Sequence, residues 1–96
     1  MLTMKLDGGF EFDIDAVTEA YDGQSKTSVL NIRCPLTGKD ASAVRKHITP
    51  DNTKHITVLS EGEDIDEYTG YRDIVTIEKT ITHFERTLNV RLRKEG

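Results

Sequence analysis

Apolar side chains recur at every second position in three stretches of the first third of the chain. The stretches are Leu2, Met4 and Leu6, then Phe10, Phe12, Ile14 and Ala16, then Leu30, Ile32 and Cys34. A period of two is typical of a β-strand with one face in the core, because successive side chains point to opposite faces. The pattern therefore predicts a chain built mainly of paired β-strands.

The first two stretches are joined by Asp7-Gly8-Gly9. This sequence suits a three-residue hairpin loop with a glycine in the left-handed conformation. A loop of that length sets Met4 opposite Phe12 on one face and Lys5 opposite Glu11 on the other, so apolar faces and charges both match.

The connection to the third stretch contains the turn signal Asp22-Gly23. A two-residue loop there would place Ile14 opposite Asn31, on the wrong face. We therefore predict an odd-numbered loop or a bulge, which pairs Ile14 with Ile32. The result is a three-stranded N-terminal meander whose outer face carries Val17, Tyr21 and Val29.

The middle of the chain predicts one short helix and one short strand. Asp40 is the expected N-cap, and the helix buries a stripe at spacings of three and four residues, formed by Ala41, Val44 and Ile48. Ile56 and Val58 then indicate a strand. The acidic residues 61–67 are expected to form a turn and loop.

The C-terminal pattern predicts a hairpin closed at Thr82-His83. The expected pairs are Ile81 with Phe84, Ile77 with Leu88, and Val75 with Val90, all on one face. The side chains of the opposite face are expected to meet solvent: Thr76, Glu78, Thr80, Glu85, Thr87, Asn89 and Arg91. Lys79 and Arg86 fall on the apolar side, which is tolerable only if the tip projects beyond the core or reaches an acidic partner.

These elements give an α+β fold of mainly antiparallel strands, arranged as a sandwich or small barrel, in a single domain over residues 1–96. Leu, Ile, Val and Phe supply 24 of the 96 residues, which is above the roughly 20% floor that marks disorder. Apolar runs never exceed two residues. We therefore expect neither a membrane span nor a signal peptide, and a cytoplasmic location.

Composition also narrows the function. The net charge is −4, whereas nucleic-acid binding relies on clustered basic residues, so no nucleic-acid partner is expected. Acids gather in two runs without a basic residue, six of them within residues 7–22 and five within residues 61–67.

Candidate chemical groups are few. His47, His55 and His83 do not stand at metal-ligand spacing, and the acidic runs lack the glycine that an EF-hand requires. Cys34, the single cysteine, is expected on the inward face of its strand as an inert thiol. We predict no catalytic residue, cofactor or metal; an enzyme or metal binder would require Cys34, a histidine and an acid to converge.

Tyr68-Thr69-Gly70-Tyr71 is the most distinctive local motif. Gly70 is expected to mark a bulge or bend that changes the facing of Tyr71. Because tyrosines are useful at interfaces, Tyr68 and Tyr71, with Val17 and Val29, are the candidate interface residues. The alternative is that one tyrosine caps the core and the other lies on the surface.

The chain resembles a loose group of small proteins encoded in phage and prophage genomes of Gram-positive bacteria, often near tail genes. The shared features are the Asp7-Gly8 hairpin, the Leu30-Asn31-Ile32 strand, a short helix over residues 42–48, residues 52–57 leading into a strand, the tyrosine motif, and a last strand through Val90 and Leu92. The resemblance implies a structural or assembly protein with no catalytic residues.

Two functional hypotheses follow. The first is a non-enzymatic phage-derived structural or assembly protein that self-associates or binds a protein partner, in the host cytoplasm or with the virion. The second is an acidic regulatory module that mimics nucleic acid and binds a basic enzyme.

Overall fold

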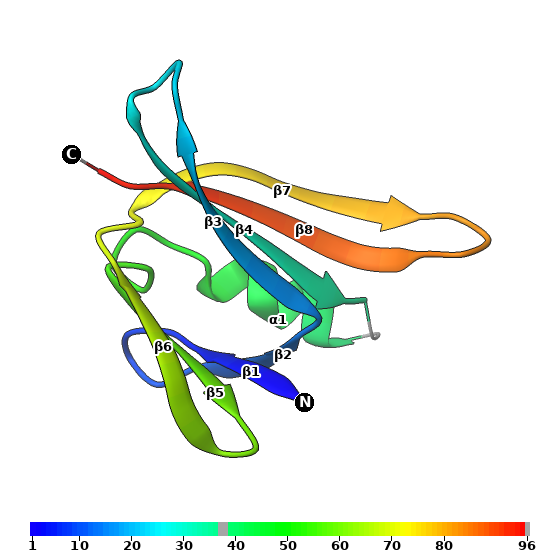
Figure 1. Cartoon of the computed structure of the whole chain (residues 1–96). Coiled ribbons are helices and arrows are strands. Elements are labelled where there is room, and N and C mark those ends of the chain that lie inside the picture. Colours follow the sequence, from blue (N-terminus) through cyan, green and yellow to red (C-terminus); the bar gives the residue numbers. More distant parts are fainter. Residues whose placement is uncertain (37–38, 96) are drawn as a thin grey trace.

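Two antiparallel four-stranded sheets and one helix make up the described part of the chain (Figure 1). The computed structural model describes residues 1–36 and 39–95, and the side chains of all of these except residues 39 and 40. The first sheet has the order β2 (Glu11–Ile14), β1 (Leu2–Lys5), β5 (His55–Ser60), β6 (Glu63–Thr69). The second has the order β3 (Ala16–Asp22), β4 (Thr27–Pro35), β8 (Arg86–Arg93), β7 (Asp73–Ile81).

Side chains from both sheets and from helix α1 (Lys39–His47) build one core. Phe12, Ile32 and Cys34 are all buried in it, as the alternation predicts. The predicted fold class, α+β with mainly antiparallel strands, is confirmed. No helix in the described part of the chain is long and apolar enough to cross a membrane.

The first hairpin has the predicted register. Met4 lies opposite Phe12 and Lys5 opposite Glu11, and the Leu6 amide donates to the Phe10 carbonyl at 2.9 Å. Gly8 and Gly9 both have positive φ, 105° and 99°, which residues other than glycine rarely adopt.

The predicted three-stranded meander is wrong, because the chain changes sheet at Asp15. β2 ends at Ile14 in the first sheet and β3 begins at Ala16 in the second. Asp15 takes the corner between them, and its amide donates to the Arg33 carbonyl at 2.7 Å. The predicted pairing requires one continuous strand, whereas a residue at a corner resets which side chains face the core.

The pairing of the third strand differs accordingly. Val17, not Ile14, lies opposite Ile32, and the β3–β4 loop holds the four residues 23–26 rather than an odd number. Lys26 takes a positive φ of 58° in this loop. Asp22 stabilises the turn by accepting from the Gln24 amide and the Ser25 hydroxyl.

The helix and the strand after it match the sequence pattern. Ala41, Val44 and Ile48 are buried as one stripe, and β5 covers the predicted strand. The helix already includes Asp40, but the predicted N-cap contact depends on its side chain and so lies outside the described residues. Since a helix of nine residues is unstable alone, its docking between the sheets holds it.

Residues 61–67 are not a loop. Glu61 and Gly62 form a tight turn with positive φ values of 51° and 82°, and β6 follows at the sheet edge. The prediction failed because β6 is exposed at nearly every position, so no apolar alternation reveals it. Backbone pairing with β5 holds it in place.

The C-terminal hairpin is present, but its register is shifted from the predicted one. Ile77 lies opposite Val90 and Ile81 opposite Arg86, leaving a four-residue turn, residues 82–85. A two-residue loop needs positive φ values that Thr-His does not favour, whereas Thr82 Oγ1 accepts from the Phe84 and Glu85 amides and closes the longer turn. A bulge near Val75 then shifts the register again, so that Ile74, opposite Leu92, packs against the core. The prediction that Val75 shares the apolar face is therefore wrong, and its side chain is 41% exposed.

Between the turn and the bulge, the shift does not change which side chains share a face. Ile77, Leu88 and Val90 still lie on the core side, as predicted. On the opposite face, Thr87 is buried rather than exposed and hydrogen-bonds with Glu85 and Asn89.

Candidate interaction surfaces

The tyrosine motif forms the joint between the two sheets. Tyr68 lies near the end of β6, Gly70 has a positive φ of 82°, and Tyr71 follows in the connection to β7. The two rings meet edge to face with centroids 6.2 Å apart. Gly70 therefore bends the chain as predicted, and the bend places both rings against the core.

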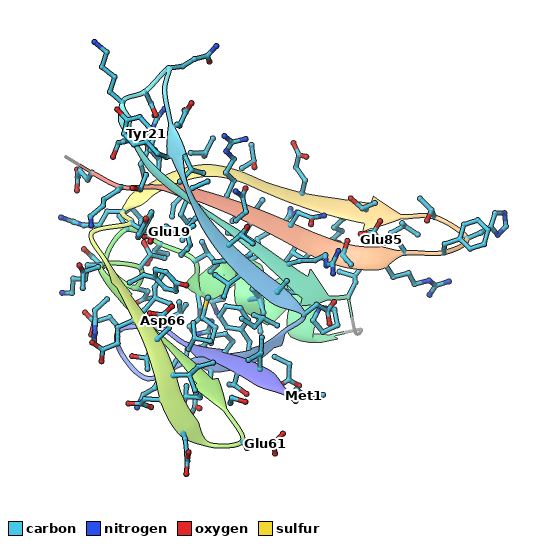
Figure 2. The ribbon with its side chains drawn as sticks, in the orientation of Figure 1. Met1, Glu19, Tyr21, Glu61, Asp66 and Glu85 are labelled. Atoms are coloured by element: carbon cyan, nitrogen blue, oxygen red, sulfur yellow. The ribbon has the colours of Figure 1, made fainter. Side chains whose placement is uncertain are left out.

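Each tyrosine hydroxyl donates to a carboxylate. Tyr71 donates to Glu19 of β3, and Tyr68 donates to Asp66 at 2.9 Å; Figure 2 labels both acids. Burial, and then these carboxylate hydrogen bonds, raise the pKa of each tyrosine to about 12. Tyr71 thus connects the second sheet to the link between the two C-terminal hairpins.

The four candidate interface residues do not form one exposed patch. Tyr71 and Val29 are buried. Val29 lies on the face of β4 opposite to Leu30 and Ile32, as predicted, but it is covered there. Val17 lies opposite Ile32 and faces the core, so the expectation that Val17 lies on the outer face is wrong. Val17 and Tyr68 are half-buried against the core. Tyr21, which shares β3 with Val17, is 70% exposed.

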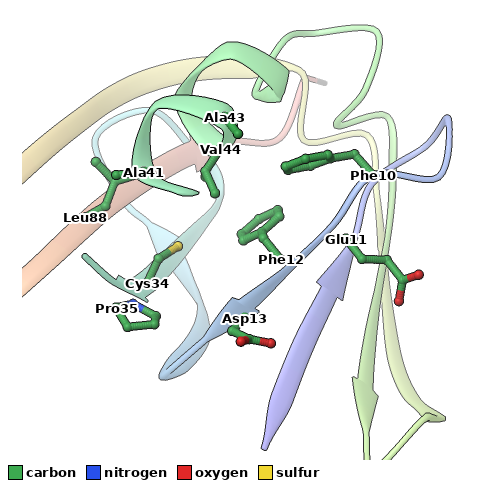
Figure 3. A pocket seen from close by; sticks show the side chains of 10 residues that line it. All are labelled: Phe10, Glu11, Phe12, Asp13, Cys34, Pro35, Ala41, Ala43, Val44 and Leu88. Atoms are coloured by element: carbon green, nitrogen blue, oxygen red, sulfur yellow. The ribbon is translucent and has the colours of Figure 1, made fainter. Parts of the chain in front are cut away.

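A crevice of about 240 Å³ opens between α1, β2 and the end of β4 (Figure 3). Eight apolar residues line it: Phe10, Phe12, Cys34, Pro35, Ala41, Ala43, Val44 and Leu88. Glu11 and Asp13 complete the lining from the edge strand β2, and their carboxylates point away from the space (Figure 3). The crevice suits an apolar group and places acids beside it.

The thiol in the crevice is not activated as a nucleophile. Burial, and then the charge of Asp15, raise the pKa of the Cys34 thiol to about 12, which keeps it in the weakly nucleophilic protonated form. His47 does not approach the thiol as a base, since it stacks on Phe10 with centroids 3.9 Å apart. Among the described residues, no group of three or more metal-ligating side chains could hold an ion.

The outer part of the β7–β8 hairpin, residues 78–86, extends beyond the rest of the molecule (Figure 1); we call it the arm. Phe84 at its tip is 99% exposed and Ile81 is 63% exposed. Alternation did not reveal that Phe84 is exposed, because it predicted that this ring would pair with Ile81 across the hairpin.

Charges on the arm divide between its faces. Lys79, Ile81 and Arg86 continue the face that is apolar in the core, and Glu78 lies on the opposite face. Both cations are exposed. The predicted projection of the tip therefore accounts for two cations on an otherwise apolar face.

The two acidic runs lie in different settings. Residues 7–22 run from the first hairpin loop through β2, the corner at Asp15 and β3, so their acids are divided between the two sheets. Residues 61–67 are instead concentrated on the exposed edge strand β6 and its turn. Charges along an edge strand are a common protection against pairing with other chains.

No family model matches this chain, no curated protein matches it, and no solved structure matches its fold.

Proposed function

We propose that this chain is a non-enzymatic structural or assembly protein that works by contact with other protein chains through the arm. The observation that carries the proposal is the fully exposed Phe84 at the tip of a projecting hairpin. Removal of an exposed phenyl ring from water by a partner stabilises the complex. Aromatic anchors of this kind are frequent hot spots of interfaces.

The turn that presents Phe84 also supports the proposal. The Thr82 amide donates to the Glu85 carbonyl at 2.7 Å, and Thr82 Oγ1 accepts from two amides of the turn. A preformed turn loses little conformational freedom on binding, so more of the contact energy contributes to affinity. The resemblance to phage proteins suggests a virion or its assembly as the setting.

Light scattering coupled to size-exclusion chromatography tests the proposal on the full chain, alone and with the products of neighbouring genes. We expect a mass above the 10.8 kDa of one chain, or a complex with a neighbouring product, and its loss in Phe84→Ser. Tyr21→Ser is the matched control, because Tyr21 is an exposed aromatic residue on another hairpin. A chain that stays monomeric and binds none of these products contradicts the proposal.

The second candidate is the acidic regulatory module, favoured by the acids gathered on β6. Binding of this kind would depend on charge and would weaken steeply with added salt. Binding to a basic nucleic-acid enzyme that modest salt abolishes supports it; binding that salt leaves unchanged excludes it.

A further inference from the structure

We infer that the arm binds a second copy of this chain, with Phe84 of one copy inserted into the crevice of the other. The inference rests on the proposed function and adds to it the identity of the partner and the receiving site. Three observations carry it: the size of the crevice, the distribution of charge, and the position of the crevice at the base of the arm.

The crevice is large enough for a phenyl ring. An apolar cavity of about 150 Å³ already admits benzene, and the crevice measures about 240 Å³. The rings of Phe10 and Phe12 stand side by side in its wall, with centroids 5.8 Å apart. Aromatic rings pair favourably at such separations in offset or edge-to-face geometry, so the wall offers a third ring a suitable surface.

Charge is complementary between the two surfaces. Lys79 and Arg86 flank Ile81 on one face of the arm, whereas Glu11 and Asp13 lie beside the crevice. Opposite potentials of this kind favour encounter and fix the orientation of binding more than they add affinity. Lys79 and Arg86, which lie on an otherwise apolar face within one chain, therefore gain acidic neighbours in a second copy.

The ring reaches a second copy because the hairpin carries it away from its own crevice. Leu88 lines the crevice from β8, and the strand runs outward from there toward Phe84 (Figure 1). An extended, paired strand cannot fold back on its own base without breaking its ladder. Reciprocal insertion would give a closed dimer, whereas insertion in one direction would give a ring or filament.

Tryptophan fluorescence tests the inference directly, because the chain contains no tryptophan. In Phe84→Trp, we expect the emission maximum to move to shorter wavelength as protein concentration rises, since the indole leaves water. Tyr21→Trp, on the other hairpin, is expected to show no such shift. Sedimentation equilibrium measures the association constant of the same samples.

Two helix variants with the same charge change separate the crevice from the rest of the surface. Ala43→Arg places a bulky cation at the crevice, whereas Ser42→Arg places it on an exposed position that does not line the crevice. We expect Ala43→Arg to weaken self-association at least about tenfold, as loss of a hot-spot contact does, and to abolish the emission shift. Ser42→Arg should leave both unchanged.

The outcomes distinguish the inference from the proposed function. If Phe84→Ser abolishes association but Ala43→Arg matches Ser42→Arg, the crevice is not the receiving site, while an interaction through the arm stands. If the chain is monomeric yet binds a neighbouring gene product through Phe84, self-insertion is overturned and the proposed function stands. If neither partner binds, both are overturned.

Discussion

The two C-terminal hairpins, β5–β6 and β7–β8, have the same arrangement of inner and outer strands, but the chemical character of their exposed surfaces differs. In each, an inner strand supplies the core, β5 with Ile56 and Val58 and β8 with Leu88, Val90 and Leu92, and the outer strand is the edge of a sheet. The edge strand β6 carries four acids and is almost wholly exposed. The other hairpin ends in the apolar tip of the arm.

The turns of the two hairpins differ in the same way. The Glu61 carboxylate accepts a hydrogen bond from the N-terminal amine of Met1 at 2.8 Å, which lowers the pKa of Glu61; Figure 2 labels both residues. Phe84 at the other turn is exposed to solvent. One hairpin thus carries charge along its edge strand, which discourages pairing with other chains, whereas the other presents an apolar group to solvent at its turn.

Removing the joint that both hairpins share should have the largest effect. Tyr71→Ala deletes a fully buried ring between β6 and β7, and we expect a loss of about 3–5 kcal/mol in the free energy of unfolding, as for other buried aromatic residues. Urea denaturation measures it. Tyr21→Ala, which removes an exposed ring, should cost less than about 0.5 kcal/mol; equal losses would mean that Tyr71 is not part of the joint.

The joint also illustrates how far the sequence predicts this fold. Alternation identified the strands whose one face is buried, and the short Asp7-Gly8-Gly9 loop fixed the register of β1 with β2. The bend at Gly70 was predictable because glycine interrupts a strand pattern there. The partner of the buried Tyr71 hydroxyl, Glu19, lies 52 residues away in the chain, so no local pattern connects the two.

Other features could not be predicted because no local signal encodes them. The corner at Asp15 depends on the packing of two sheets, and it leaves the alternation of residues 10–16 intact. β6 lacks apolar alternation because both of its faces meet solvent. The crevice combines residues from strands and a helix far apart in the chain, so only the folded structure brings Phe12, Cys34 and Val44 together.

High pH should weaken the joint in a defined window. Both tyrosines have their pKa raised from the ordinary 10 to about 12, so the folded state disfavours tyrosinate. The stabilisation is complete below pH 10 and is lost as the pH rises through about 12. We expect wild type to exceed Tyr71→Phe by about 1 kcal/mol near neutral pH, the value of a typical hydrogen bond.

That difference in unfolding free energy should shrink as the pH rises from about 10 toward 12, because only the wild type can ionise at this position. Denaturation at a series of pH values measures it. A difference that stays constant over this range would show that the hydroxyl of Tyr71 does not titrate with folding.

Removing negative charge from the edge strand β6 should leave it unprotected against pairing with other chains. We expect Asp64→Thr with Glu67→Thr to cause concentration-dependent association, because unpaired backbone groups of an edge strand then meet other chains without charge repulsion. The test is made in a Phe84→Ser background, so that the arm does not contribute, and is measured by light scattering. Asp51→Thr with Glu95→Thr gives the same charge change outside the strands, and association in this control as well would assign the effect to net charge.

The smallest expected effect is the change in stability when the tip of the arm is altered. Phe84→Ser should shift the unfolding free energy by less than about 0.5 kcal/mol, since the ring is already in water in the isolated chain. Leu92→Ala in the same hairpin should cost about 2–5 kcal/mol, because Leu92 is fully buried. Both are measured at a protein concentration low enough to keep the chain monomeric, since association would add to apparent stability. A large loss in Phe84→Ser under these conditions would mean that the ring packs within its own chain, and the contrast between the two hairpins would then concern folding rather than assembly.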